Sequence, residues 1–136
     1  MYNLKIIEMK NLFVSYEVAL KLKELGFDEE CFGEYIEGNN NIPILDIYQE
    51  IDYAGLDYSP KVLCLAPLYQ QVVDWVRENH DIDIEISKAG SPKKYKVFIP
   101  NLLHGYIYEY DNEIKQFNYY EALDAAIEEA IKLIEK

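Results

Sequence analysis

Apolar residues recur at helical spacing in three segments of the chain, the first of which is 15–27. Its apolar positions, three or four residues apart, are Val18, Leu22 and Leu25. Ser15 precedes the segment, and Gly26 follows its last apolar position. Serine is a favoured N-cap, and a glycine beyond the last turn adopts the left-handed conformation that ends a helix. The pattern predicts a helix that starts at Ser15 and ends at Gly26, with Phe27 folded back onto Leu22.

Two later segments show the same helical spacing. Pro67 opens the segment 67–79 and stands where a first helical residue is expected, because its fixed φ suits that position. The apolar stripe of this segment is Leu68, Val72, Trp75 and Val76. The segment 118–136 opens with Asn118 and Glu121, which have the spacing of a capping box. Its predicted buried face is Leu123, Ile127, Ala130, Ile131 and Ile134.

Alternating apolar and polar residues predict strands between these helices. Residues 31–37 and 42–48 flank a Gly/Asn turn and predict a hairpin, although 42–53 also has helical spacing and the choice between strand and helix stays open. Residues 54–60 predict a loop. Three further strands are predicted at 82–87, 94–99 and 105–110.

The order of these elements predicts an α+β protein that forms one domain over residues 1–136. Its C-terminal half is predicted to run helix, three strands, helix, with helices packed on one face of a small antiparallel sheet. A sub-boundary, if the chain has two halves, is predicted near residues 55–61. With 136 residues, half of them apolar, the chain can bury a core without a metal or a disulfide.

The net charge of −12 narrows the class of partner. Such a charge repels nucleic-acid phosphates and anionic membrane surfaces, so we predict another protein as the partner, and neither nucleic acid nor membrane. Residues 28–60 hold nine carboxylates and no Lys or Arg. This segment predicts a solvated acidic face, with a dedicated docking surface as the alternative. The nearest basic cluster is Lys88, Lys93, Lys94 and Lys96.

The two cysteines and the chain start indicate a cytoplasmic protein. The first residues lack the apolar stretch of a signal peptide, and no run reaches the ~18 apolar residues of a membrane span. Cys31 and Cys64 are predicted to be reduced thiols. Their distances in sequence from His80 and His104 do not match the paired short spacings of zinc motifs, so no metal or other cofactor is predicted.

The densest cluster of reactive side chains lies at 80–85 and has a structural explanation. His80 is predicted at a helix C-terminus, where the dipole favours a partly positive group, while Asp83 and Glu85 share the outward face of a strand. His104 could act as a base, but no nucleophile lies in a known catalytic motif. We therefore predict no catalytic, cofactor-binding or metal-ligating residue, and an enzyme using His80 or His104 is the least favoured class.

Thirteen tyrosines form the main aromatic feature. Tyr106, Tyr108 and Tyr110 share one side of a predicted strand, and Tyr95 is placed beside them on its neighbour. Tyrosine suits both the margin of a core and a recognition surface. Alternation alone does not decide between these two roles.

Three stretches carry a resemblance to a known group of proteins. Residues 19–35, 66–79 and 117–134 resemble an uncharacterised family of small acidic proteins encoded in gut Bacteroidetes genomes and their phages or mobile elements. The resemblance covers most of the chain apart from 38–60. It implies an intracellular accessory protein of mobile-element origin and assigns no activity to any residue.

The predicted helix–three-strand–helix order also resembles a double-stranded RNA-binding domain. Such domains place lysines at the start of the final helix, whereas residues 118–124 here read NYYEALD and are acidic. The leading prediction is therefore a small non-enzymatic protein-interaction module. The alternative is an acidic nucleic-acid mimic that occupies a basic protein groove. The oligomeric state stays open.

Overall fold

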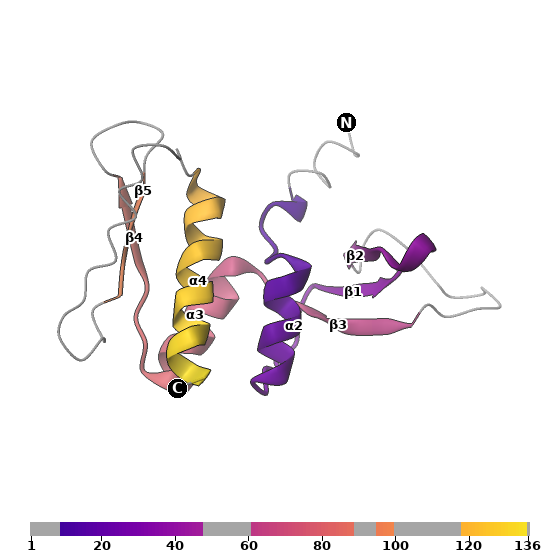
Figure 1. The fold of residues 1–136 in the computed structure, drawn as a ribbon, viewed down its shortest axis with the longest axis horizontal. Coiled ribbons are helices and arrows are strands. Elements are labelled where there is room, and N and C mark those ends of the chain that lie inside the picture. The colour runs from indigo at the N-terminus through magenta and orange to yellow at the C-terminus, as the bar shows by residue number, and fades with distance from the viewer. Residues whose placement is uncertain (1–8, 48–60, 89–94, 100–117, 136) are drawn as a thin grey trace. The chain divides into compact units, whose positions relative to one another are not determined.

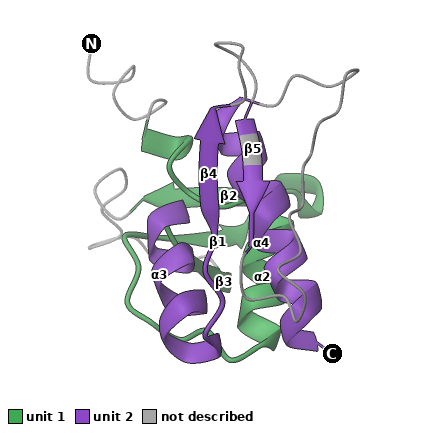
Figure 2. Cartoon of the chain, turned by 90° about the vertical axis from the view of Figure 1, so that its left-hand side faces the viewer, with its two compact units in different colours: residues 1–68 green, residues 69–136 purple. Residues whose placement is uncertain are grey.

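A computed structural model describes residues 9–47, 61–88, 95–99 and 118–135 and confirms the α+β class (Figure 1). The chain forms two compact units, Met1–Leu68 and Tyr69–Lys136 (Figure 2). The boundary between the units follows Leu68, later in the chain than the sub-boundary predicted near residues 55–61.

The first unit contains helix α2 (Tyr16–Glu24) and a three-stranded antiparallel sheet. Its strands are β1 (Gly33–Glu37), β2 (Pro43–Ile47) and β3 (Val62–Ala66), in the order β2-β1-β3. The short 3-10 turn η1 (Asn39–Asn41) joins β1 to β2. Helix α2 packs beside β3 (Figure 1). This arrangement confirms the predicted hairpin and shows that residues 43–47 are strand, while 48–53 lie outside the described residues.

Both ends of α2 are set by the residues that the sequence singled out. The Ser15 side chain accepts a hydrogen bond from the Val18 N–H at 3.4 Å. At the other end Gly26 has φ 95°, and the Phe27 N–H donates to the Leu22 carbonyl at 2.9 Å. This bond closes a Schellman-type stop, in which the left-handed glycine turns the chain back over the last helical turn.

The β1–β2 connection depends on backbone conformations that few residues adopt. Asn40 and Asn41 have φ values of 58° and 60°, which asparagine tolerates better than most side chains. A Cβ on Gly38 would lie 2.4 Å from the Ile42 carbonyl oxygen and 2.6 Å from the Ile44 side chain. Only glycine fits there, so this residue holds the hairpin in register.

Strand β3 and the chain after it differ from the prediction. No strand was predicted at 62–66, yet these residues pair with β1. A helix was predicted from Pro67, but α3 begins at Tyr69. The Pro67 carbonyl accepts from the Val14 N–H at 3.0 Å, and Leu68 forms a bridge with Phe13. These two residues are committed to pairing within the first unit, and the helix starts only after them.

The second unit contains helix α3 (Tyr69–His80), the antiparallel hairpin β4 (Glu85–Lys88) and β5 (Tyr95–Phe98), and helix α4 (Tyr119–Glu135). Helix α4 packs on both β5 and α3 (Figure 1). The predicted third strand, 105–110, lies outside the described residues. Two strands of the predicted helix–three-strand–helix order are thus present between the helices.

The core of the second unit confirms most of the apolar stripes of its two helices, but Leu68 precedes α3 and Ile134 is only half-buried. Trp75 is 6% exposed, and Ile127 is fully buried. The remaining buried residues of α4 are Ala122, Leu123, Ala126, Ala130 and Ile131. Asn118 and Glu121 form the predicted capping box, since each side chain accepts from the other's backbone N–H, at 2.8 and 3.4 Å.

Candidate functional site

The acidic and histidine cluster at 80–85 is divided between a helix end and a connection. His80 is the last residue of α3, and its ring meets the Trp75 ring edge-on, with centroids 4.8 Å apart. Asp81 follows with φ 54°, and Ile82 is buried. The strand begins only at Glu85, so Asp83 precedes it, contrary to the prediction of one strand face carrying both carboxylates. Residues 82–84, which the alternation had assigned to the strand, instead connect the left-handed Asp81 to β4.

His80 belongs to no metal-binding cluster among the residues that the structure describes. No group of three or more His, Cys, Asp or Glu side chains that could hold a metal ion occurs in the described part of the chain. His104 lies outside that part. The contact of His80 with the indole ring of Trp75 accounts for its position at the end of the helix.

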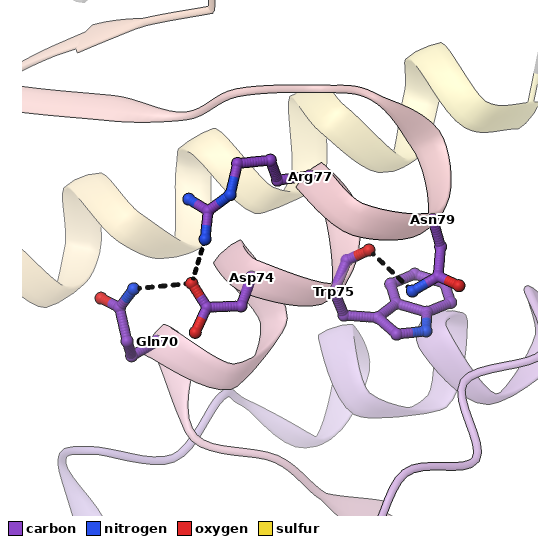
Figure 3. Close-up of polar contacts among 5 residues, drawn as sticks. All are labelled: Gln70, Asp74, Trp75, Arg77 and Asn79. Atoms are coloured by element: carbon purple, nitrogen blue, oxygen red, sulfur yellow. Dashed lines mark hydrogen bonds and ion pairs between the residues drawn. The ribbon is translucent and has the colours of Figure 1, made fainter.

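A polar network on the outer side of α3 is also structural (Figure 3). Asp74 Oδ1 accepts from Gln70 Nε2 at 3.1 Å and from Arg77 Nη2 at 2.6 Å. Asn79 Nδ2 donates to the Trp75 carbonyl at 3.1 Å. The two contacts of Asp74 join exposed side chains three or four positions apart, and each such pair contributes about 0.2–0.5 kcal/mol, whereas the Asn79 bond is partly buried. They stiffen the helix and leave no group directed at a substrate.

Four tyrosines connect the elements of the second unit. Tyr95 of β5 packs edge-on against Tyr119, whose ring lies 5.8 Å from that of Tyr120. Tyr120 in turn lies 6.0 Å from Tyr69 of α3. Such ring pairs stabilise packing by about 0.5–1.5 kcal/mol each. For Tyr95 this supports the margin of a core; Tyr106, Tyr108 and Tyr110 lie outside the described residues.

The clearest concave surface belongs to the first unit and consists of two adjoining hollows. The acidic hollow, of about 540 Å³, is lined by Asp28, Glu29, Glu30, Cys31, Phe32 and Leu65. The apolar hollow, of about 270 Å³, is lined by Ala19, Lys23, Phe27, Val62, Leu63 and Cys64. Asp28 and Leu65 line both, so the two hollows share a wall. Together they lie along α2, β3 and the segment that connects α2 to β1.

The two cysteines occupy different environments in these hollows. Both are thiols in the structure. Burial raises the pKa of the Cys64 thiol above its ordinary value, and the nearby Lys23 ammonium opposes part of that rise. Cys31 is half-buried and donates to the Glu29 carbonyl at 3.3 Å. Cys64 is therefore held as a neutral thiol, the opposite of what a nucleophile needs.

The surface around the hollows combines apolar and acidic side chains. Phe32 is 67% exposed and Val62 is 48% exposed. Asp28, Glu30 and Glu37 are also exposed, as the prediction of a solvated acidic face requires. Asp46, which lies in the same segment, corrects that prediction, because it is only 1% exposed. The register of β2 places it opposite Glu34 in the sheet.

Comparison with protein-family models, curated proteins and solved structures finds no match. Within the described residues, no helix combines the length and the apolar character needed to cross a membrane. The hollows of the first unit are the candidate site. The sequence offered the acidic segment 28–60 as an alternative docking surface, but it did not indicate the part that α2 and β3 contribute.

Proposed function

We propose that this chain is a small non-enzymatic protein-interaction module, which binds its partner over the two hollows of the first unit. The single observation that carries the proposal is the exposed Phe32 ring beside an open, partly apolar concave surface. Large aromatic side chains are costly to leave in water and are enriched at the centres of protein interfaces. A partner that covers the Phe32 ring would remove it from water and so stabilise the complex.

The chemistry of the hollows supports binding over catalysis. The acidic hollow holds three consecutive carboxylate residues, 28–30, with no histidine lining it. The apolar hollow holds a protonated thiol, Cys64, whose burial works against thiolate formation. Neither set forms a nucleophile with a base, which is the minimum for acyl transfer.

The mixture of side chains also supports a peptide-binding surface over a nucleic-acid mimic. A mimic presents rows of carboxylates to a basic groove, so apolar contact contributes little to it. Here Phe32, Val62 and Leu65 line the same two hollows as the acidic residues. The proposal includes a cytoplasmic location, which the two free thiols support because disulfides are rare there. An origin in a phage or mobile element, supported by the family resemblance, belongs to the same proposal.

A displayed library of random peptides, selected on the intact protein, tests this function. Hits are re-measured as soluble fluorescent peptides against Phe32→Ala and against Ile42→Ala. Ile42 is the matched control, since it is 62% exposed in the same unit and lines neither hollow. We expect Phe32→Ala to weaken binding about tenfold, as loss of a central aromatic contact does, and Ile42→Ala to leave it unchanged. The proposal fails if no ligand is selected or if both variants behave alike.

A further inference from the structure

We infer that the occupant of this surface is an extended peptide segment of another protein, with a large apolar side chain two positions away from a Lys or Arg. The inference rests on the proposed function and names the chemistry of the partner. It follows from a difference between the two hollows: one offers apolar walls, and the other offers carboxylates.

The apolar hollow is suited to a single aliphatic or aromatic side chain. Ala19 and Phe27 of the α2 region form one part of its lining, and Val62 and Leu63 of β3 form another. Its volume of about 270 Å³ is enough for one large side chain. Burying such a side chain there stabilises the complex in proportion to the apolar area removed from water.

The acidic hollow is suited to a cation. Asp28 and Glu30 are exposed and Glu29 is half-buried, and all three line it. They begin a chain segment, 28–60, that holds nine carboxylates and no Lys or Arg. A Lys or Arg of the partner would meet opposite charge there, and an acidic side chain would be repelled.

Lys23 makes the two ends of the surface different in charge. It lines the apolar hollow, and its ammonium donates to the Leu63 carbonyl at 2.9 Å. A second cation brought to that end would be repelled by Lys23. The basic residue of the partner therefore belongs over the acidic hollow, and the apolar residue belongs beside Lys23.

The shared wall sets the spacing between the two side chains. Because Asp28 and Leu65 line both hollows, the anchor and the cation come from nearby positions of one segment. In an extended segment, side chains two residues apart point the same way and are separated by roughly 6–7 Å. An apolar residue and a basic residue at positions i and i+2 fit this geometry.

The first arm of the test compares charge-matched variants. Asp28→Asn with Glu29→Gln removes two charges from the acidic hollow, and Glu37→Gln with Glu78→Gln removes two exposed charges elsewhere. The ligand is a fluorescein-labelled peptide with Leu and Lys at i and i+2. We expect the double variant in the acidic hollow to lower its affinity about tenfold at low salt, and by a smaller factor at high salt, where the charges are screened. The control pair should change it by less than about twofold. Equal effects of the two pairs would overturn the charge assignment.

The second arm tests the apolar hollow and the occupant. Val62→Ser should weaken the same peptide, while Ile44→Ser, at 45% exposed on the far strand of the sheet, should not. Replacing Lys by Glu in the peptide should abolish binding. If library ligands depend on Phe32 but are neutral or acidic, the proposed function stands and this inference fails. If sedimentation shows Phe32-dependent self-association instead, the occupant is a second copy of the chain and the inference is equally overturned.

Discussion

Truncation of Ile127 to alanine is the sharpest test of the core of the second unit. Ile127 is fully buried in the middle of α4, and the change removes three carbon atoms from its side chain. At about 0.8 kcal/mol per buried methylene, the lost transfer free energy is roughly 2.4 kcal/mol. A residual cavity of roughly 50 Å³ adds about 1.2 kcal/mol at about 24 cal/mol per Å³. We therefore expect a loss of about 3–4 kcal/mol in the free energy of unfolding.

Urea denaturation followed by tryptophan fluorescence measures this loss. Trp75 is the only tryptophan of the chain and is buried in the same unit as Ile127, so its emission follows the relevant unfolding. Ile127→Val, which removes one carbon, should cost about 0.5–1.5 kcal/mol. Lys132→Ala is the control on the same helix, because its ammonium is exposed and pairs with Glu129 at 3.1 Å, and it should cost less than about 0.5 kcal/mol.

The expected losses in unfolding free energy decrease in the order Ile127→Ala, Ile127→Val, Lys132→Ala. If Ile127→Ala loses less than about 1 kcal/mol, the packing of α4 on its neighbours is not what the structure describes. If Lys132→Ala loses as much as Ile127→Ala, the loss does not come from a cavity in the core, and the cavity argument fails.

The remaining predictions concern the helix cap, the thiols, metal content and nucleic acid. Asn118→Ala should cost about 0.5–2 kcal/mol, seen as a lower urea midpoint, and an unchanged midpoint would contradict the capping box. Maleimide should label Cys31 faster than Cys64 in the folded protein, and equal rates would contradict the burial of Cys64. The raised pKa of Cys64 should stabilise the fold fully below the ordinary thiol range, and this stabilisation should fade at higher pH because the unfolded chain loses its thiol proton first. Cys64→Ala should lack this alkaline loss, measured as the difference in unfolding free energy between the two proteins at each pH. Native mass spectrometry should find no stoichiometric metal, and chelator should leave the melting temperature unchanged. Fluorescence titration with duplex DNA or RNA at moderate salt should show no binding, and persistent micromolar binding would overturn the assignment of a protein partner.

Features with local causes could be predicted from the sequence. The ends of α2, the β1–β2 turn and the start of α4 each depend on side chains within a few residues of one another, and all three were predicted. The local pattern also contained a signal for β3 that was missed, since 62–66 is an apolar run between Pro60 and Pro67. Such a run is ambiguous until its pairing partner is known.

Features with long-range causes could not be predicted. Pro67 has the local character of a helix start, but its carbonyl is held by Val14, far away in sequence. The hollows arise in the same way, because Lys23 and Leu63 meet across forty residues. The sequence shows that residues 28–30 are acidic and that Phe32 is aromatic. It does not show that β3 folds back beside them to make one surface.

The capping box of α4 has a consequence for how the gene can change. Asn118 and Glu121 cap the start of the helix by hydrogen bonds to each other's backbone, so the capping contacts come from residues 118–121 themselves. Insertions, deletions or sequence drift upstream of this point can therefore accumulate without altering where the helix begins. A reporter peptide or a second domain inserted ahead of residue 118 would leave the capping contacts intact, which makes this position a natural place to extend the protein.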